Sequence, residues 1–287
     1  LLDFLKNDEM KKRLGVVATR YMSAERVLSL TLNAVSRTPL LKACTLESVL
    51  GAIMTTTALG LEPNTPRQLA YLIPYRRSVK KKGGGFYSLI ECQFQIGYRG
   101  FIELGYRSPH LAVIQAGSLR KNDFLEHQEG TESYLRYRKA LADRGDLIGA
   151  WAYIKLARPG ATAELMEVTD YDDLMKIKSK SEAYRGAVAA LEKAKTEEAR
   201  EWASRKLAEV PWEQWVDEMA AKSAIKRIFK MVPLNPDQVA DSNRLTAAIA
   251  IDNVHDTHRL NLAALEDPTL AAAIAAGNAA VPELEHD

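Results

Sequence analysis

Tyrosines and arginines alternate in one short stretch of the chain, where the residue types are suited to binding chemistry. Tyr98, Arg99, Tyr106 and Arg107 stand in two Gly-Tyr-Arg triplets eight residues apart. A tyrosine ring can stack on a base and a guanidinium can bind phosphate, so this alternation fits a single strand of nucleic acid. The alternative is that the tyrosines pack in the core while the arginines pair with a nearby acid such as Glu91 or Glu103.

Five cations and three glycines lie just before these triplets. The cations are Arg76, Arg77, Lys80, Lys81 and Lys82. The flanking segments "LAYLIPY" and "SLIECQFQI" have the pattern of strands, which predicts a hairpin with "RRSVKKKGGGF" at its tip. Such an arm can follow a phosphate backbone and gain affinity by releasing counterions. The alternative is a solvated loop; a nucleotide-phosphate loop is not expected, because the order GxxxxGK[ST] is missing.

A third group of cations lies far along the chain, in a segment predicted to form one helix over residues 212–231. Its members are Lys222, Lys226, Arg227 and Lys230. The three lysines recur every four residues, about 6 Å per step on a helix, which predicts a rail that follows several phosphates. The alternative is an ordinary wet surface. Lys178 and Lys180 in "KIKSK" are weaker candidates for the same role.

Charge is distributed unevenly along the 287 residues. Residues 61–110 hold eight Lys or Arg and three Asp or Glu, whereas the last 27 residues hold five acids and no Lys or Arg. This segregation predicts a polyanion-binding region and a separate acidic tail. The composition, with 47% hydrophobic and 26% charged residues, is that of a soluble globular protein. No run is long and apolar enough to span a bilayer, so we expect no membrane association and a cytoplasmic location.

The order of elements favours an α+β fold. Helices are expected in the first sixty residues, with Ser23 and Thr45 as N-caps and Gly60 at a helix end. Strands follow, among which "LIGAWAYIKLA" is expected to be central because it is apolar on both faces. Helices return from Tyr171, including one long charged helix over 186–209. We therefore expect a helical region at 1–60, a core domain at 61–235 and a helical, acidic tail at 236–287.

No catalytic or metal site is predicted from the residue patterns, and no cofactor is expected. Cys44 and Cys92 lack the spacing of a zinc site and are expected to be buried. A metal-dependent nuclease using Asp123 or Asp172 with magnesium remains one alternative function. A non-catalytic adaptor, whose basic groove binds an acidic protein, is another.

The quoted segments also resemble a known family. "ALGLEP", "AYLIPY", "QFQIGYRGFIELGYRS" and "PW…DEMAAKSAIKRIFK…VP" are similar in order and spacing to the RecT family of phage single-strand annealing proteins, over residues 45–235. Two departures are the length of the charged segment 186–209 and Ser223, where the family usually has threonine.

The resemblance implies a function, a fold and partners. It implies ATP-independent annealing of complementary DNA strands in phage recombination, by a ring or helical homo-oligomer that works with a phage exonuclease. It implies the fold of the phage Red beta protein, in which a small β-sheet packs on helices and DNA lies in a basic groove. The three groups of cations would line that groove and hold one strand, then the annealed duplex. The acidic tail is a candidate for docking a host replication protein.

Overall fold

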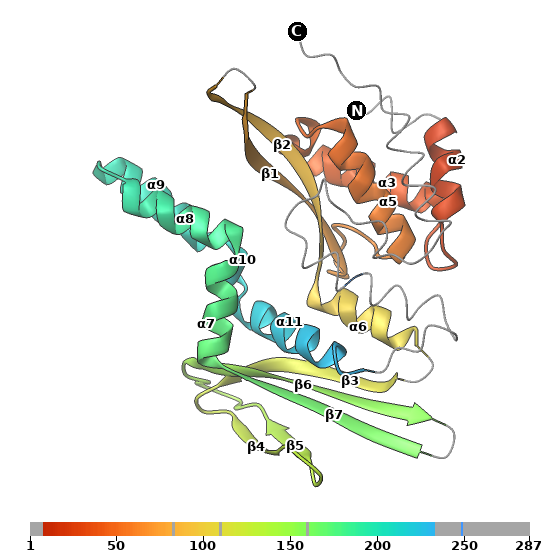
Figure 1. The fold of residues 1–287 in the computed structure, drawn as a ribbon, viewed down its shortest axis with the longest axis vertical. Helices are drawn as coiled ribbons and strands as arrows, with labels where there is room; N and C mark the ends of the chain where they lie inside the picture. The colour runs from red at the N-terminus through yellow and green to blue at the C-terminus, as the bar shows by residue number, and fades with distance from the viewer. Residues whose placement is uncertain (1–7, 82–83, 109–110, 159–160, 233–247, 249–287) are drawn as a thin grey trace. The chain divides into compact units, whose positions relative to one another are not determined.

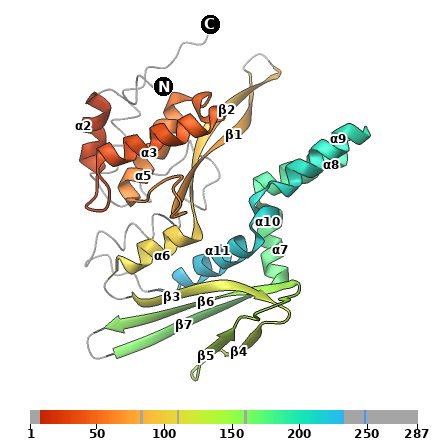
Figure 2. The same ribbon diagram turned by 180° about the vertical axis from the view of Figure 1, so that it is seen from behind.

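The computed structural model describes residues 8–81, 84–108, 111–158, 161–232 and 248. These residues divide into two compact units: unit 1 takes in the described residues up to Ser108 together with residue 248, and unit 2 takes in those between residues 109 and 233. Figures 1 and 2 show both units as mixtures of helices and small antiparallel sheets, which confirms the α+β class at this level. In this division the first hairpin groups with the N-terminal helices, and the three regions expected from the sequence stay a prediction.

Unit 1 contains five helices and one two-stranded ribbon among its described residues. Its elements are α2 (Asp8–Val17), α3 (Ala24–Arg37), α4 (Pro39–Lys42), α5 (Leu46–Leu59), β1 (Ala70–Lys80), β2 (Phe86–Ile96) and α6 (Tyr98–Tyr106). The predicted caps are confirmed: Ser23 accepts from the amide of Arg26, Thr45 accepts from the amide of Ser48, and Gly60 ends α5 with φ of 60°.

The base of the β1–β2 ribbon is attached to the start of α5. The amide of Thr45 donates to the carbonyl of Ile90 at 2.9 Å, and the hydroxyl of Ser48 accepts from the amide of Cys92 at 2.9 Å. Cys92, Phe94 and Ile96 are buried, as the alternating pattern predicts, but Glu91 on the opposite face is buried as well. The part of β2 from Glu91 to Ile96 therefore packs in the core, whereas the residues nearer the turn, from Phe86 to Ser88, are exposed.

Unit 2 combines strands and helices in a different arrangement. Its strands are β3 (Leu111–Arg120), β4 (Phe124–Gln128), β5 (Tyr134–Arg138), β6 (Leu147–Arg158) and β7 (Ala161–Asp170). Its helices are α7 (Tyr171–Lys180), α8 (Glu182–Lys193), α9 (Glu197–Ala208), α10 (Pro211–Gln214) and α11 (Val216–Phe229). The sheet order β3-β6-β7 confirms β6, the segment "LIGAWAYIKLA", as a central strand. In both views, α11 and the β4–β5 hairpin lie on opposite sides of this sheet.

Two helix predictions in unit 2 are wrong. The segment 186–209 is not one helix, because Thr196 caps a new helix by accepting from the amide of Ala199, and α8 and α9 fold into a helical hairpin. The segment 212–231 is also broken: Trp215 has φ of −129° and ψ of 48°, which separates α10 from α11. Trp215 is exposed and does not share the buried environment of Trp212. The short strand β4 was not predicted, because most of its side chains are exposed and it lacks an apolar face.

Among the described helices, none has the length and apolar character required to cross a bilayer.

Candidate nucleic-acid interface

The outer half of the β1–β2 ribbon forms a basic arm, defined here as residues 76–90. The strands pair further than predicted, since Arg76 lies opposite Ile90 and the backbone of Lys80 pairs with that of Phe86 before the turn. The turn is closed by hydrogen bonds between Lys81 and the two glycines at 84 and 85, whose φ angles are 89° and 81°. Positive φ favours glycine, which explains the glycines at this turn. Arg76 and Lys81 are exposed. The side chains of Arg77 and Lys80, and all of Lys82, fall outside the described residues.

Two aromatic residues on the basic arm were not singled out from the sequence. Phe86 is 69% exposed and lies opposite Lys80 in the strand register, and the neighbouring Tyr87 is also exposed. The arm thus carries exposed rings on the same ribbon as the exposed Arg76 and Lys81, the combination that single-stranded nucleic acid can use for stacking and phosphate contacts. The clue in the sequence was the pair "FY" placed directly after the glycines.

The two Gly-Tyr-Arg triplets mark the start and the end of α6. Arg99 is exposed at its start, with its guanidinium 6.0 Å from the centre of the Tyr98 ring. Tyr106 is exposed near its end. Gly97 and Gly100 are required by close packing, because a Cβ on Gly100 would lie 2.1 Å from the carbonyl oxygen of Leu69. The start of α6 is therefore fixed against the chain leading into β1.

The side chain of Arg107 is buried and bonded to the end of α5. Its side chain is only 5% exposed, and it donates to the carbonyls of Leu59 and Gly60 at 2.6 and 2.8 Å. It also lies 3.9 Å from the centre of the Tyr21 ring and 3.6 Å from the carboxylate of Glu103. Arg107 therefore differs from the exposed Arg99, because it turns inward to hold the carbonyl end of α5.

In unit 2, the lysines of α11 lie away from the sheet. The helix buries Ala221, Ile225 and Ile228 among others, and it contacts β3, β6 and β7. Lys222 and Lys226 are half-buried, while Lys230 is exposed at the C-cap. The four-residue spacing of these lysines is thus retained on one helix, even though α11 is shorter than predicted.

Three further candidate residues in unit 2 differ in how freely they could bind a phosphate. Arg227 forms ion pairs with Asp173 at 2.8 Å and with Glu167 at 3.4 Å. Lys178 is 15% exposed, pairs with Glu213 at 2.7 Å and lies over the ring of Tyr184. Lys180 is exposed at the end of α7. A phosphate would therefore have to displace a carboxylate at Arg227 and at Lys178. Lys180 has no such ion pair within the described residues.

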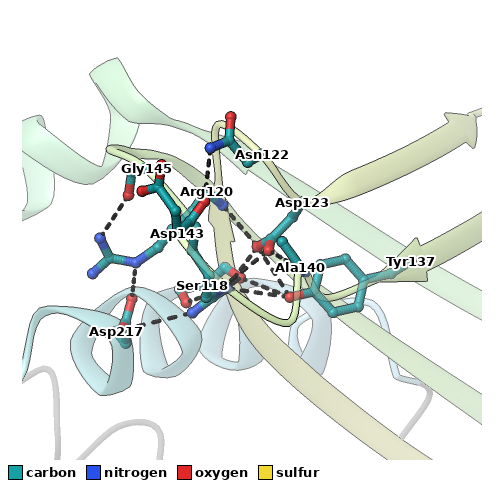
Figure 3. A network of polar contacts seen from close by, with 10 residues as sticks. Ser118, Arg120, Asn122, Asp123, Tyr137, Ala140, Asp143, Gly145 and Asp217 are labelled. Carbon is teal, nitrogen blue, oxygen red and sulfur yellow. Dashed lines mark hydrogen bonds and ion pairs between the residues drawn. The ribbon is translucent and has the colours of Figure 1, made fainter.

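A buried polar network joins β3, the β4–β5 hairpin and α11 (Figure 3). The carboxylate of Asp123 is fully buried and accepts hydrogen bonds from Arg144, Tyr137 and the amides of Arg120 and Ala140. Burial alone would raise the pKa of Asp123, but these donors outweigh it and hold the pKa below its usual value. Arg120 extends the network to Asp217 on α11 at 3.0 Å.

This network bears on the nuclease alternative. The carboxylate of Asp123 accepts from the amide of Ala140 and from the guanidinium of Arg144, so it positions the loop after β5. In the part of the chain that the structure describes, no group of three or more His, Cys, Asp or Glu side chains is arranged to hold a metal ion. Cys44 and Cys92 are buried as predicted, and burial raises the pKa of Cys44 to about 11, so this thiol stays protonated at neutral pH.

The candidate residues fall into two groups, one in each unit. The basic arm and α6 belong to unit 1, and α7 and α11 belong to unit 2. Within unit 1, the structure gives exposed Arg76, Lys81 and Arg99. A single groove that includes both groups stays a prediction.

Comparison with known proteins gives two matches. The sequence model described as "RecT family" matches residues 25–256. The chain is also similar to "Protein RecT" of Escherichia coli (strain K12), with 28% identity over 235 residues that cover 82% of this chain and 76% of that protein.

Proposed function

The chain belongs to the RecT family of recombination and annealing proteins, and from this premise we propose that it binds single-stranded DNA and anneals complementary strands without ATP. The observation that best supports this function is the basic arm, in which exposed cations and exposed rings lie on one ribbon. Such a surface recognises the phosphate and the faces of the bases, which every sequence offers.

The annealing mechanism requires no chemical step on the protein. Arg76, Lys81 and Arg99, together with the lysines of α11, would hold the phosphates of an extended strand and leave the base edges available to a complement. Base pairing itself supplies the free energy of annealing. The protein neutralises the repulsion between the two backbones and aligns the strands. Because phosphate contacts carry no base identity, little sequence preference is expected.

The candidate residues have different roles in this proposal. Arg77, Lys80 and Lys82 extend the phosphate contacts of the arm, and Tyr98 and Tyr106 offer rings near Arg99. Lys180 and Lys230 are exposed contacts of unit 2, while Lys178 and Arg227 would first have to leave their carboxylates. Arg107 positions α6 against α5 and is not among the phosphate contacts that we now propose.

The wider proposal concerns assembly and partners. We infer a Red beta-like annealing fold, with DNA in one groove lined by the cations of both units. We propose a ring or helical homo-oligomer that acts in the cytoplasm of a bacterial host during phage recombination. A phage exonuclease would supply the single strands, and the acidic tail would contact a host replication protein.

The test is an annealing assay with two complementary oligonucleotides and no ATP. The variant Lys222→Glu, Lys226→Glu, Lys230→Glu should slow duplex formation at least tenfold relative to wild type, because each change replaces attraction to phosphate with repulsion. The control variant Lys42→Glu, Lys121→Glu, Lys139→Glu has the same change in charge at exposed positions outside the candidate surface.

Equal rates for wild type and the α11 variant would remove these lysines from the mechanism. Oligonucleotide binding that is undetectable even at low salt would instead support the adaptor alternative. Magnesium-dependent cleavage of the oligonucleotides by pure protein would support the nuclease alternative.

A further inference from the structure

An exposed tryptophan lies in the middle of α9, the second helix of the α8–α9 helical hairpin. Trp202 on α9 is 54% exposed, whereas the next residue, Ala203, is buried. The hairpin packs mainly through contacts between its own two helices and joins the rest of unit 2 through α7 and α10. An indole held in water on a helix surface offers a large apolar contact area, and tryptophan is enriched in the centres of protein interfaces.

Two side chains of opposite charge lie at equal distances from Trp202 along α9. Glu198 lies four residues before Trp202, and Lys206 lies four residues after it, with Arg205 beside it. Residues three or four apart share a helix face, so these side chains and the indole form one stripe about 12 Å long. All of them are exposed. One end of the stripe is acidic and the other end is basic, at equal distances from the ring.

We propose that this stripe, residues 198–206 of α9, is a contact surface for a second copy of the same chain. Two α9 helices would pack antiparallel, with the two Trp202 rings meeting at a twofold axis. Glu198 of each copy would then face Lys206 of the other, so that two ion pairs flank a buried aromatic centre. A surface with opposite charges at equal distances from its centre is self-complementary, as a twofold interface requires.

This contact differs from the assembly in the proposed function. A ring or a helical filament needs head-to-tail contacts, which join two different surfaces, whereas the α9 contact joins like to like and closes at two copies. It would therefore pair single chains, or join two growing assemblies, without DNA. The exposed ion pair between Lys206 and Glu209, at 2.6 Å, would exchange for the pair with Glu198 of the second copy at small cost.

The first test is thiol cross-linking of the full chain in the absence of DNA. A Trp202→Cys variant places one thiol of each copy at the twofold axis, and mild oxidation should give a disulfide-linked dimer. The matched control is Ser204→Cys, which is exposed on α9 but lies about 200° around the helix from Trp202. The native cysteines are buried and add no background. We expect at least tenfold more cross-linked dimer for Trp202→Cys than for the control, and equal yields would overturn the proposal.

The second test exchanges charges and uses analytical ultracentrifugation, with helical circular dichroism to verify folding. Glu198→Lys and Lys206→Glu should each weaken dimerisation at least tenfold, because each places like charges opposite each other. Mixing the two variants should restore dimers, since every facing pair is then of opposite charge. If the mixture stays as dissociated as each variant alone, the proposed pairing is wrong.

The outcome is separable from that of the annealing proposal. If Trp202→Ser leaves the oligomeric state unchanged but weakens oligonucleotide binding, the stripe contacts DNA and the self-contact is excluded. If the stripe variants lose dimers but anneal oligonucleotides at the wild-type rate, the self-contact stands and annealing does not depend on it.

Discussion

The carboxylate of Asp123 accepts hydrogen bonds from four residues while its side chain is fully buried. Donors from Arg120 on β3 and from Ala140 and Arg144 in the loop after β5 take the place of water around this carboxylate. The carboxylate thereby joins β3 to that loop. Its partner Arg144 also donates to the carbonyl of Ser118 at 3.1 Å, so the pair is embedded in further polar contacts. Buried charges of this kind are tolerated only when their partners remain in place.

We expect Asp123→Asn to lower the free energy of unfolding by about 3 kcal/mol at neutral pH, because it leaves the largely buried guanidinium of Arg144 with only the longer ion pair to Asp217, at 3.9 Å. Urea denaturation measures this change. The exposed Asp146→Asn, in the same loop region, should change stability by less than about 0.5 kcal/mol. Equal effects of the two substitutions would show that the buried network contributes little.

The same carboxylate predicts a dependence on pH. The pKa of Asp123 is lowered in the folded state, so its contribution to stability is present above the unfolded pKa of about 4 and is lost as the pH falls through the folded pKa. The difference in unfolding free energy between wild type and Asp123→Asn should therefore shrink as the pH is lowered from 5 to about 2. A difference that is constant over this range would contradict the assigned ionisation.

Arg107 provides a second prediction at the residue scale. Arg107→Lys should lower the free energy of unfolding by about 2 kcal/mol, since an ammonium cannot reproduce the two bonds to the carbonyls of Leu59 and Gly60. Arg99→Lys, at the equivalent position of the first triplet, should have little effect on stability. Oligonucleotide affinity of folded Arg107→Lys should stay within twofold of wild type; a tenfold loss would return Arg107 to the phosphate contacts.

Identical local sequence did not predict the different surroundings of Arg99 and Arg107. Both stand in Gly-Tyr-Arg triplets, and composition alone assigned both to phosphate. What separates them is a tertiary partner: the end of α5, 47 to 48 residues away, presents unsatisfied carbonyls to Arg107. Contacts of this range are not encoded by spacing within a segment.

At the scale of elements, glycine positions distinguish close packing from open surface. Gly100→Ala should lower the free energy of unfolding by more than about 2 kcal/mol, because the added Cβ would overlap the carbonyl oxygen of Leu69. Gly186→Ala, on the exposed surface of α8, should raise it by about 0.5 to 1 kcal/mol, since alanine favours the helix and meets no atom within 4 Å. Urea midpoints of the two variants should move in opposite directions, and movement in the same direction would refute the packing assigned to α6.

Elements with a strong local pattern were predictable, and those set by subtler capping were not. Ser23, Thr45 and Gly60 marked helix ends correctly, and the two-sided apolar pattern of β6 placed it in the centre of its sheet. The break between α8 and α9 was missed because the segment is helical in composition on both sides, and only the Thr196 cap divides it. The break at Trp215 was missed because the whole segment 212–231 was assigned to one helix.

At the scale of the whole molecule, binding to DNA should depend on salt. Arg76→Gln with Lys81→Gln removes two proposed phosphate contacts, so the slope of log affinity against log salt for an oligonucleotide should fall by about 1.4. Lys42→Gln with Lys121→Gln is the matched control and should leave the slope unchanged. The loss should be similar for oligonucleotides of different sequence; a loss confined to one sequence would indicate base recognition instead of phosphate binding.

The distribution of charge along the sequence predicted which segments carry cations but not how those cations are arranged in the folded chain. The sequence identifies the arm, α6 and α11 as basic or aromatic, and the structure adds exposure, strand register and the rings of Phe86 and Tyr87. It also removes Arg107 from the exposed set. Convergence of the two units on one strand requires a relation between segments more than a hundred residues apart, which no local pattern specifies.

The location of the tryptophans has a practical consequence for spectroscopy. All four, Trp151, Trp202, Trp212 and Trp215, belong to unit 2, where two are buried and two are exposed. Fluorescence excited at the long-wavelength edge of the indole absorption therefore reports on unit 2 alone. An unchanged emission spectrum after adding an oligonucleotide would therefore not show whether the basic arm binds it. A fluorophore attached to the basic arm would be needed to observe that contact.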